Sequence, residues 1–502
     1  MGILFINGIF HSMEKEREVF SGLLMEDGII KEVFNRIPEA GIHTVFDCRG
    51  SCVFPGFIDT HTHSFEGGLY SLGADLSEIN SLPELFEVLS VSKRLGDKII
   101  AWRFNEENIK EKRFPTIDEL DKIFPETPVL IRRVDGHSCI ANSAALKKIH
   151  WVKKPDISLS AAFARDQNKA ITRWFHSNLE EETILKAYAA AAENAIKGGC
   201  TTVHVMIGDG KSDPLHFSLL REHLKDFPVE FILYPQVANV EVAAGLDSPR
   251  LGGCLLVDGS FGSHTAALLK PYTDRPEIRG QLYNSNAYWE SLVSQAHAAG
   301  LQCAVHAIGD AAIRQITEVY HSVQQKHSKD LRHMIIHCEL LSDTLLFEGV
   351  LNKILDSGTA LVIQPMFDRL WGGSSGFYSK VMGEERALHT NRLQSIREKN
   401  ILLTGSSDWY VTELNPLKGI HAAVHLHNPK ERLTPFQALE LYTSKAALLS
   451  FDEGRLGKLL PGFQADMVCL SENPLPATNI DTIKINYLFK KGKLIRDNFP
   501  FH

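Results

Sequence analysis

Eight short apolar runs, with helical patterns between most of them, constrain the fold more than any other feature of this sequence. The runs lie at residues 53–63, 201–206, 229–234, 254–258, 302–306, 333–337, 359–364 and 401–408. The clearest helical patterns lie at 182–197, 215–225, 288–299 and 311–325. Strands that alternate with helices form parallel sheets. Eight such units predict an α/β protein built on a (β/α)8 TIM barrel.

The two ends of the chain carry a different pattern, in which short strands are joined by turns. These strands are expected at 3–6, 22–33, 465–470 and 485–489. Because neither end can bury a face alone, we expect residues 1–55 and 452–502 to form one small β-sandwich domain. The barrel then spans 56–451. Residues from about 64 to 195 form an α/β insertion after its first strand, with a strand of their own at 129–134.

The composition excludes several classes of protein. Hydrophobic residues make up 44% of the chain and charged residues 23%, as in ordinary globular proteins. A net charge of −8 offers no basic surface for nucleic acid. The first residues lack the pattern of a secretory signal, and no stretch is apolar for long enough to cross a membrane. The eight cysteines show no paired spacing, which predicts a reducing, cytoplasmic location.

Residues that commonly bind metals gather where the predicted strands end. His61 and His63 are separated by one residue, so they point to the same side of a strand. His306, His337 and Asp408 end later strands. A single histidine at such a place is usually structural, but strand ends meet at one face of a barrel. The five residues together therefore predict a metal centre, for which zinc is the preferred ion.

Two further polar residues lie close to this pattern. Asp59 is expected on the same side of the first strand as the two histidines. His204 also ends a strand-like run, and we expect it to lie beside the ligands without binding the ion.

These residues belong to longer motifs, and the motifs together cover nearly the whole chain. They are Pro55-Gly-Phe-Ile-Asp-Thr-His-Thr-His63, Arg133-Val-Asp-Gly-His-Ser138 with Asn142-Ser143, Asp258-Gly-Ser-Phe-Gly-Ser263, Val305-His-Ala-Ile-Gly-Asp310, Gly405-Ser-Ser-Asp-Trp409 with Asn415-Pro-Leu417, and Gly457-Lys-Leu-Leu-Pro-Gly-Phe-Gln-Ala-Asp466. In this combination the chain resembles the amidohydrolase superfamily, and specifically its YtcJ-type branch, which includes N-substituted formamide deformylases.

The resemblance implies a role for each strand-end residue. His61 and His63 bind the metal from the first strand, and His306 binds it from the fifth. His337 contacts the metal or its water from the sixth strand, and Asp408 closes the site from the eighth. The resemblance also implies the barrel and β-sandwich architecture that the strand pattern predicts.

Three positions depart from the pattern of the relatives. Many relatives carry a lysine that, when carboxylated, bridges two metals, whereas this chain has Cys254. A thiolate can bind zinc, but a cysteine in an apolar strand more often only packs, so both interpretations stay open. His264 replaces a usual arginine, and Met366-Phe367 replaces a motif that contains histidine. The last two changes predict an unusual substrate preference.

The missing lysine also bears on the number of metal ions. Without a bridging anion, two divalent ions close together repel each other strongly, so we expect one ion per chain. A bridging thiolate of Cys254 is the alternative that would allow two.

The implied reaction is hydrolysis of a C–N bond in a small amide, N-acyl or cyclic amide substrate. A divalent ion lowers the pKa of its bound water to about 7. Asp408 is the expected general base, His337 assists it, and His137 would stabilise the oxyanion. The residues expected to hold the substrate are Asp258, His264, Asp310 and Trp409.

Other functions stay open from the sequence. The same superfamily includes hydrolytic deaminases, and a non-catalytic regulatory protein could also retain the barrel. The complete set of strand-end ligands favours an enzyme. We expect no nucleic-acid or membrane partner, and the sequence leaves a homo-oligomer open.

Overall fold

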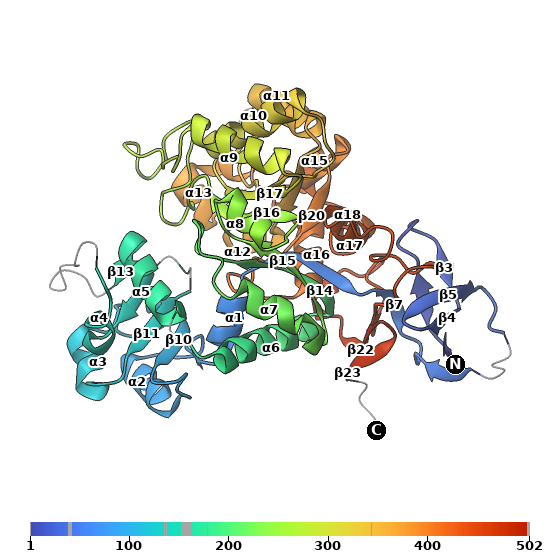
Figure 1. The fold of residues 1–502 in the computed structure, drawn as a ribbon, viewed down its shortest axis with the longest axis horizontal. Helices are drawn as coiled ribbons and strands as arrows, with labels where there is room; N and C mark the ends of the chain where they lie inside the picture. The colour runs from blue at the N-terminus through green and yellow to red at the C-terminus, as the bar shows by residue number, and fades with distance from the viewer. Residues whose placement is uncertain are drawn as a thin grey trace. The chain divides into compact units, whose positions relative to one another are not determined.

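The computed structural model describes residues 2–38, 43–134, 136, 138–151, 162–177, 179–342 and 344–498. The chain divides into two compact units, whose elements are labelled in Figure 1. The first unit comprises Met1–Thr62 and Ala192–His502, and the second comprises His63–Ala191. Of the helices in the described part of the chain, none is long and apolar enough to span a membrane.

Eight parallel strands form the centre of the first unit. They are β8 (Phe57–Thr62), β14 (Cys200–Ile207), β15 (Glu230–Pro235), β16 (Arg250–Leu256), β17 (Gln302–Ala307), β18 (Met334–His337), β19 (Ala360–Ile363) and β20 (Leu403–Gly405). They pair in the orders β15-β14-β8 and β16-β17-β18-β19-β20. Thr62 forms a parallel bridge to Trp409, and the Thr60 hydroxyl donates to the Gly405 carbonyl at 2.9 Å. The first and last strands therefore lie next to each other.

Helices separate these strands along the chain, which confirms the predicted α/β class. They include α6 (Glu181–Lys197), α7 (Phe217–His223), α8 (Val240–Gly245), α9 (Asn286–Ala298), α10 (Asp310–Lys326), α11 (Thr344–Asp356), α15 (Leu393–Glu398) and α16 (Pro416–Val424). Local signals set their starts: the Ser285 hydroxyl, for example, accepts a hydrogen bond from the Tyr288 amide and caps α9. Buried apolar residues from several strands, such as Met206, Ala304 and Val362, pack into one cluster.

The apolar run at 53–63 forms two strands in different sheets, which divide at the boundary expected between residues 55 and 56. β7 (Cys52–Pro55) ends before Gly56, and β8 begins after it. The Gly56 amide donates to the Asp466 carbonyl at 2.9 Å. A Cβ atom at Gly56 would lie only 2.3 Å from the Thr201 side chain, so a glycine is needed at this crossing.

Strands from both ends of the chain lie in one sheet of the first unit. Its order is β23-β22-β21-β7-β2-β3. Besides β7, it contains β2 (Ile9–His11), β3 (Val19–Phe20), β21 (Met467–Leu470), β22 (Ile485–Lys490) and β23 (Lys493–Asp497). A second sheet, in the order β5-β4-β1-β6, holds β1 (Ile3–Ile6), β4 (Gly22–Glu26), β5 (Ile29–Phe34) and β6 (Thr44–Asp47). Phe5 and Phe489 meet edge to face at 5.1 Å in the core that they share.

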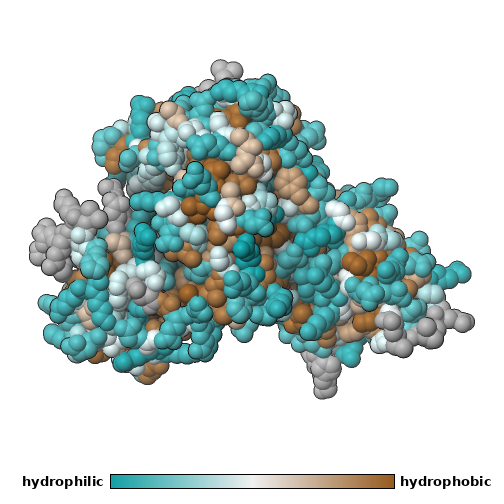
Figure 2. Space-filling view, in the orientation of Figure 1, coloured by the Kyte–Doolittle hydropathy of each residue, from teal (hydrophilic) through white to brown (hydrophobic). Residues whose placement is uncertain are grey.

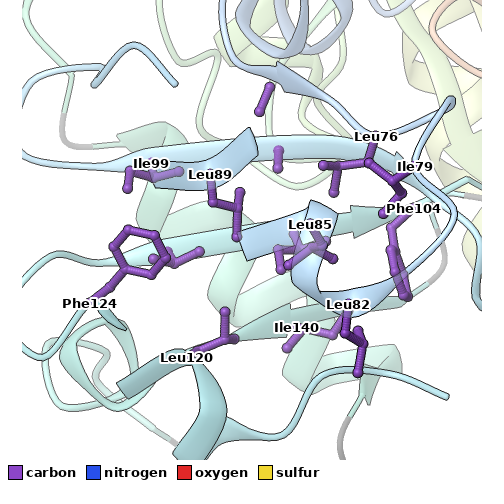
Figure 3. Close-up of a cluster of buried hydrophobic side chains, with 14 of the residues drawn as sticks. Leu76, Ile79, Leu82, Leu85, Leu89, Ile99, Phe104, Leu120, Phe124 and Ile140 are labelled. Atoms are coloured by element: carbon purple, nitrogen blue, oxygen red, sulfur yellow. The ribbon is translucent and has the colours of Figure 1, made fainter. Parts of the chain in front are cut away.

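The second unit has a five-stranded sheet in the order β13-β12-β11-β10-β9. Its strands are β9 (Ala74–Asp75), β10 (Ile99–Phe104), β11 (Val129–Arg133), β12 (Ser138–Ala141) and β13 (Phe163–Ala164). Figure 3 shows side chains of helix α2 (Leu82–Val91), such as Leu85 and Leu89, packed in an apolar cluster with Phe104 and Ile140. β11 confirms the strand predicted at 129–134.

The surface agrees with the composition. Polar side chains cover much of the face drawn in Figure 2, with smaller hydrophobic areas between them. None of the eight cysteines forms a disulfide.

Candidate metal centre

Four candidate ligands come from parallel strands of the first unit. His61 lies near the end of β8, Cys254 in β16 and His306 in β17, while His337 is the last residue of β18. All four side chains are buried. The carboxyl ends of parallel strands meet at one edge, so the fold brings together residues that are far apart in the sequence.

Asp408 reaches the same site from a loop rather than from a strand. The prediction that it ends the last strand was wrong, because β20 stops three residues earlier at Gly405. The Asp408 backbone has a left-handed φ of 53°, and its amide donates to the His61 carbonyl at 3.1 Å. Oδ1 of Asp408 lies 3.1 Å from Nε2 of His61.

Asp59 holds this loop against β8. Its carboxylate accepts hydrogen bonds from the backbone amides of Ser407, at 3.0 Å, and of His61, at 3.2 Å. Burial raises the pKa of Asp59 to about 6, although these hydrogen bonds oppose the shift. Asp59 therefore positions the residues that flank the His61–Asp408 contact.

Hydrogen bonds fix the ring orientation of His306. Its Nε2 lies 3.0 Å from the carbonyl oxygen of Gly259. A carbonyl only accepts, so Nε2 carries a hydrogen, and Nδ1 is the nitrogen that is left to face a metal ion. This Nδ1 lies 3.9 Å from Sγ of Cys254.

His337 is oriented in the same way through Gln364. The Ser406 hydroxyl donates to the Ile363 carbonyl at 3.3 Å and accepts from Nε2 of Gln364 at 2.9 Å. Oε1 of Gln364 therefore faces Nδ1 of His337, at 2.7 Å, and accepts its hydrogen. The lone pair of His337 is then on Nε2, which leaves this nitrogen to bind a metal ion.

The candidate ligand atoms form two groups that share one member. The ligand atoms of Cys254, His306 and His337 lie within 4.8 Å of one another. The ligand atoms of His61, His63 and Cys254 also lie within 4.8 Å of one another. His63 is the first residue after β8. Ligands around one tetrahedral zinc lie roughly 3.3–3.6 Å apart, given Zn–N near 2.0–2.1 Å and Zn–S near 2.3 Å. The donor set thus fits a divalent ion.

Electrostatics at the site also favours positive charge. Burial opposes protonation of each ring, but Asp408 and Cys254 outweigh it at His61 and raise its pKa. Cys254 likewise outweighs burial at His306 and raises its pKa to about 9. At His337 burial and the neighbouring His306 lower the pKa. A cation bound here would be stabilised by the same anionic groups.

His204 lies near these ligands but belongs to neither group. It is buried in β14, and its ring stacks on Tyr234 at 5.5 Å. Its carbonyl accepts a hydrogen bond from the Thr62 hydroxyl at 2.7 Å.

Two predicted substrate residues hold loops at the mouth of the site. The buried Asp258 carboxylate accepts from the amides of Ala267, Ile308 and Gly309 at 2.8–3.0 Å. Burial raises its pKa to about 6. Asp310 accepts from the Leu269 amide at 2.8 Å and from the Ser342 hydroxyl at 2.6 Å. A substrate role of either residue stays a prediction.

The other predicted residues are placed as follows. Nε2 of His264 lies 2.9 Å from Oδ2 of Asp274, and the ring lies against Tyr272. Trp409 is buried, and its amide donates to the Ser407 hydroxyl at 3.1 Å. His137, the expected oxyanion group, lies outside the described residues.

The structure adds Glu339, which the sequence patterns did not indicate, and gives the contacts of Phe367, where the chain departs from its relatives. Glu339 is buried two residues after His337, and burial raises its pKa to about 8, although Tyr378 opposes the shift. Phe367 stacks on His337 at 5.8 Å and contacts Trp371 at 4.7 Å. Glu339 and Gln364 lie outside any ligand motif, so only the position of Glu339 close to His337 could have drawn attention to it.

Comparisons with known proteins identify the family of this chain. The model of the amidohydrolase family matches residues 44–496. YtcJ of Bacillus subtilis, an amidohydrolase by name, is 25% identical and covers 100% of this chain and 99% of its own. The N-substituted formamide deformylase of Arthrobacter pascens is 22% identical over 94% of each chain. The crystal structure of a metal-dependent hydrolase from Pyrococcus furiosus is 26% identical, with a TM-score of 0.78, and covers 95% of this chain and 100% of its own.

Proposed function

The chain belongs to the amidohydrolase family, and from this premise we propose that it is a metal-dependent hydrolase that cleaves a C–N bond in a small amide, N-acyl or cyclic amide. One observation carries the proposal. A buried set of imidazole, thiol and carboxylate groups, oriented by hydrogen bonds, meets at the carboxyl ends of parallel strands. Because a fold alone does not define a reaction, the proposal depends on this site.

We propose that the eight parallel strands close into a (β/α)8 barrel. The bridge between Thr62 and Trp409 supports the closure between β8 and β20. On this proposal the barrel spans 56–451, and the sandwich domain comprises 1–55 and 452–502. The sheet that pairs β7 with β21 supports that domain. Residues from about 64 to 195 form the insertion.

The proposed metal ligands are His61, His63, His306, His337 and Asp408, together with Cys254. Nitrogen and sulfur donors favour zinc among the common divalent ions. When bound, such an ion polarises a substrate carbonyl and makes a water molecule more acidic. The eight cysteines form no disulfide, which supports a reducing, cytoplasmic location.

Asp408 is the proposed proton-transfer residue. Its carboxylate lies at the ligand cluster, 3.1 Å from His61, and is held by the loop that Asp59 fixes. It accepts a proton from the attacking water and returns it to the leaving nitrogen. His337, which Gln364 orients, assists this proton transfer. His137 stabilises the oxyanion in this proposal.

The aromatic residues near His337 indicate the shape of the substrate. Phe367 and Trp371 form an apolar wall beside the ring of His337. The loops that Asp258 and Asp310 fix, with His264 and Trp409, complete the proposed substrate region. An amide with an apolar group next to the scissile bond fits such a wall best.

A chelation experiment tests the proposed function. Purified protein is stripped of metal, restored with zinc and assayed on a panel of N-formyl, N-acetyl and cyclic amides by the release of amine. We expect hydrolysis of at least one amide that disappears on chelation, returns with zinc and is lost in His306→Ala. His223→Ala, a change at a partly exposed histidine, serves as the control. Hydrolysis that persists in the metal-free protein or in His306→Ala would contradict the proposal.

A further inference from the structure

Cys254 is the one side chain common to both groups of candidate ligands in the described part of the chain. We propose that its thiolate is shared between two divalent cations, one held with His61, His63 and Asp408 and the other with His306 and His337. The inference rests on the proposed function only in requiring that the site binds metal. It replaces the single ion expected from the missing lysine.

The backbone of β16 is built to aim Cys254 at the ligands. The pairing of β16 with β17 shifts register between Gly252 and Leu255, which leaves two residues in a bulge. Bulges of this kind redirect a side chain and are common beside active sites. Cys254 is one of the two bulged residues, and its thiol lies beside Nδ1 of His306.

Two glycines make this bulge possible. Gly252 and Gly253 have φ values of 89° and 110°, which side chains rarely allow. A Cβ atom would lie 2.3 Å from the Ala304 carbonyl at Gly252 and 2.2 Å from Sδ of Met206 at Gly253. A cysteine that only filled space in an apolar strand would not need such a backbone, so the bulge favours ligation over packing.

The distances suit a shared ligand. Sγ of Cys254 lies 3.9 Å from Nδ1 of His306. A sulfur and a nitrogen bound to one tetrahedral zinc lie about 3.6 Å apart, from Zn–S near 2.3 Å and Zn–N near 2.0–2.1 Å. On the other side, Cys254 interacts with His61, whose Nε2 lies 3.1 Å from Asp408. The thiol is therefore within reach of both halves of the centre.

Charge explains why the shared ligand matters. Two divalent ions in one centre lie about 3.5–4 Å apart and repel each other unless an anion lies between them. Neutral imidazoles from His61, His306 and His337 bring no negative charge. A thiolate at Cys254 supplies a negative charge at the position common to both groups.

Metal titration tests the inference. Metal-free protein is titrated with cobalt(II) and with zinc, and the number of ions bound per chain is measured by calorimetry and elemental analysis. We expect two ions per chain in the wild type and a thiolate-to-cobalt charge-transfer band in the near ultraviolet. Cys254→Ser should bind one ion and lose the band. Cys254→Asp, which keeps an anion, should bind two ions without the band.

Cys303→Ser is the matched control, because Cys303 is a buried cysteine of β17 whose thiol interacts with Tyr320. This variant should keep two ions and the band. One ion in the wild type, or a cobalt protein without the band, would overturn the inference while leaving a metal-dependent hydrolase in place. A wild-type protein that binds neither metal would overturn the proposed function as well. If a Cys254 variant fails to fold, the number of ions bound by the wild type, taken together with its spectrum, still tests the inference.

Discussion

Nδ1 of His337 donates a hydrogen bond to Oε1 of Gln364 at 2.7 Å, and this contact decides which ring nitrogen faces the candidate metal centre. Gln364 is itself held by the Ser406 hydroxyl. Groups that orient a ligand in this way typically contribute 10- to 100-fold to metal affinity.

Gln364→Leu should therefore weaken zinc binding by about 10- to 100-fold, because His337 loses the acceptor that fixes its ring. Competition with a zinc-binding dye measures the affinity. Gln364→Glu keeps an acceptor oxygen toward His337 and should retain most of the zinc affinity. Equal affinities in the Leu variant and the wild type would show that Gln364 does not position His337.

Asp408→Asn should retain metal but lower turnover by at least about 100-fold on any amide that the protein hydrolyses. The amide keeps the size and one oxygen of the carboxylate and removes its basicity. Steady-state kinetics and metal content are measured on the same preparation. Glu413→Gln, an exposed carboxylate in the same loop, should behave like the wild type. A fully active Asn variant would reject the proton-transfer role.

Gly56→Ala should lower the stability by about 1–3 kcal/mol, the usual cost of overpacking. The added methyl group would lie 2.3 Å from Thr201, where β7 passes into β8. Gly245→Ala is the matched control, since a Cβ atom there meets nothing within 4 Å. Thermal unfolding should show a lower midpoint for Gly56→Ala alone. Equal midpoints would mean that the crossing tolerates a side chain.

Acid should destabilise the protein partly through His333. Burial lowers the pKa of this histidine to about 3, against 6.5 for an unperturbed side chain. The folded state therefore binds fewer protons than the unfolded state. The contribution of His333 to the stability of the fold is complete above pH 6.5 and is lost as the pH falls toward 3. Nε2 of His333 also lies 3.0 Å from Nδ1 of His297, and this contact favours the neutral form of His333.

The melting temperature of the wild type should fall more steeply between pH 6.5 and 4.5 than that of His333→Gln. His321→Gln, a change at a partly exposed histidine, is the control, and its melting temperature should follow that of the wild type. Parallel curves for all three proteins would exclude His333 as a source of the acid sensitivity.

Local sequence pattern was sufficient for most strands and for the histidines that end them. His306 and His337 end apolar runs, and the period of a strand and the topology of parallel sheets place them at one edge. α9 and α10 also lie close to their predicted positions, because their helical patterns are long.

Features that depend on distant parts of the chain were not predictable in this way. Asp408 leaves its strand early because Asp59 and His61 bind the loop. Gln364 gains its role only through its contact with His337. Each of these outcomes depends on a partner more than 25 residues away in the sequence.

Elemental analysis of the purified protein tests the central claim most directly. The wild type should contain a divalent metal, with zinc predominating, and the His61→Ala/His63→Ala double variant should lose at least the ion that these two histidines hold. Both proteins should show the same circular dichroism spectrum, because the two histidines lie at the end of β8 and the beginning of the following segment. Equal metal content in the wild type and in the folded double variant would contradict the account.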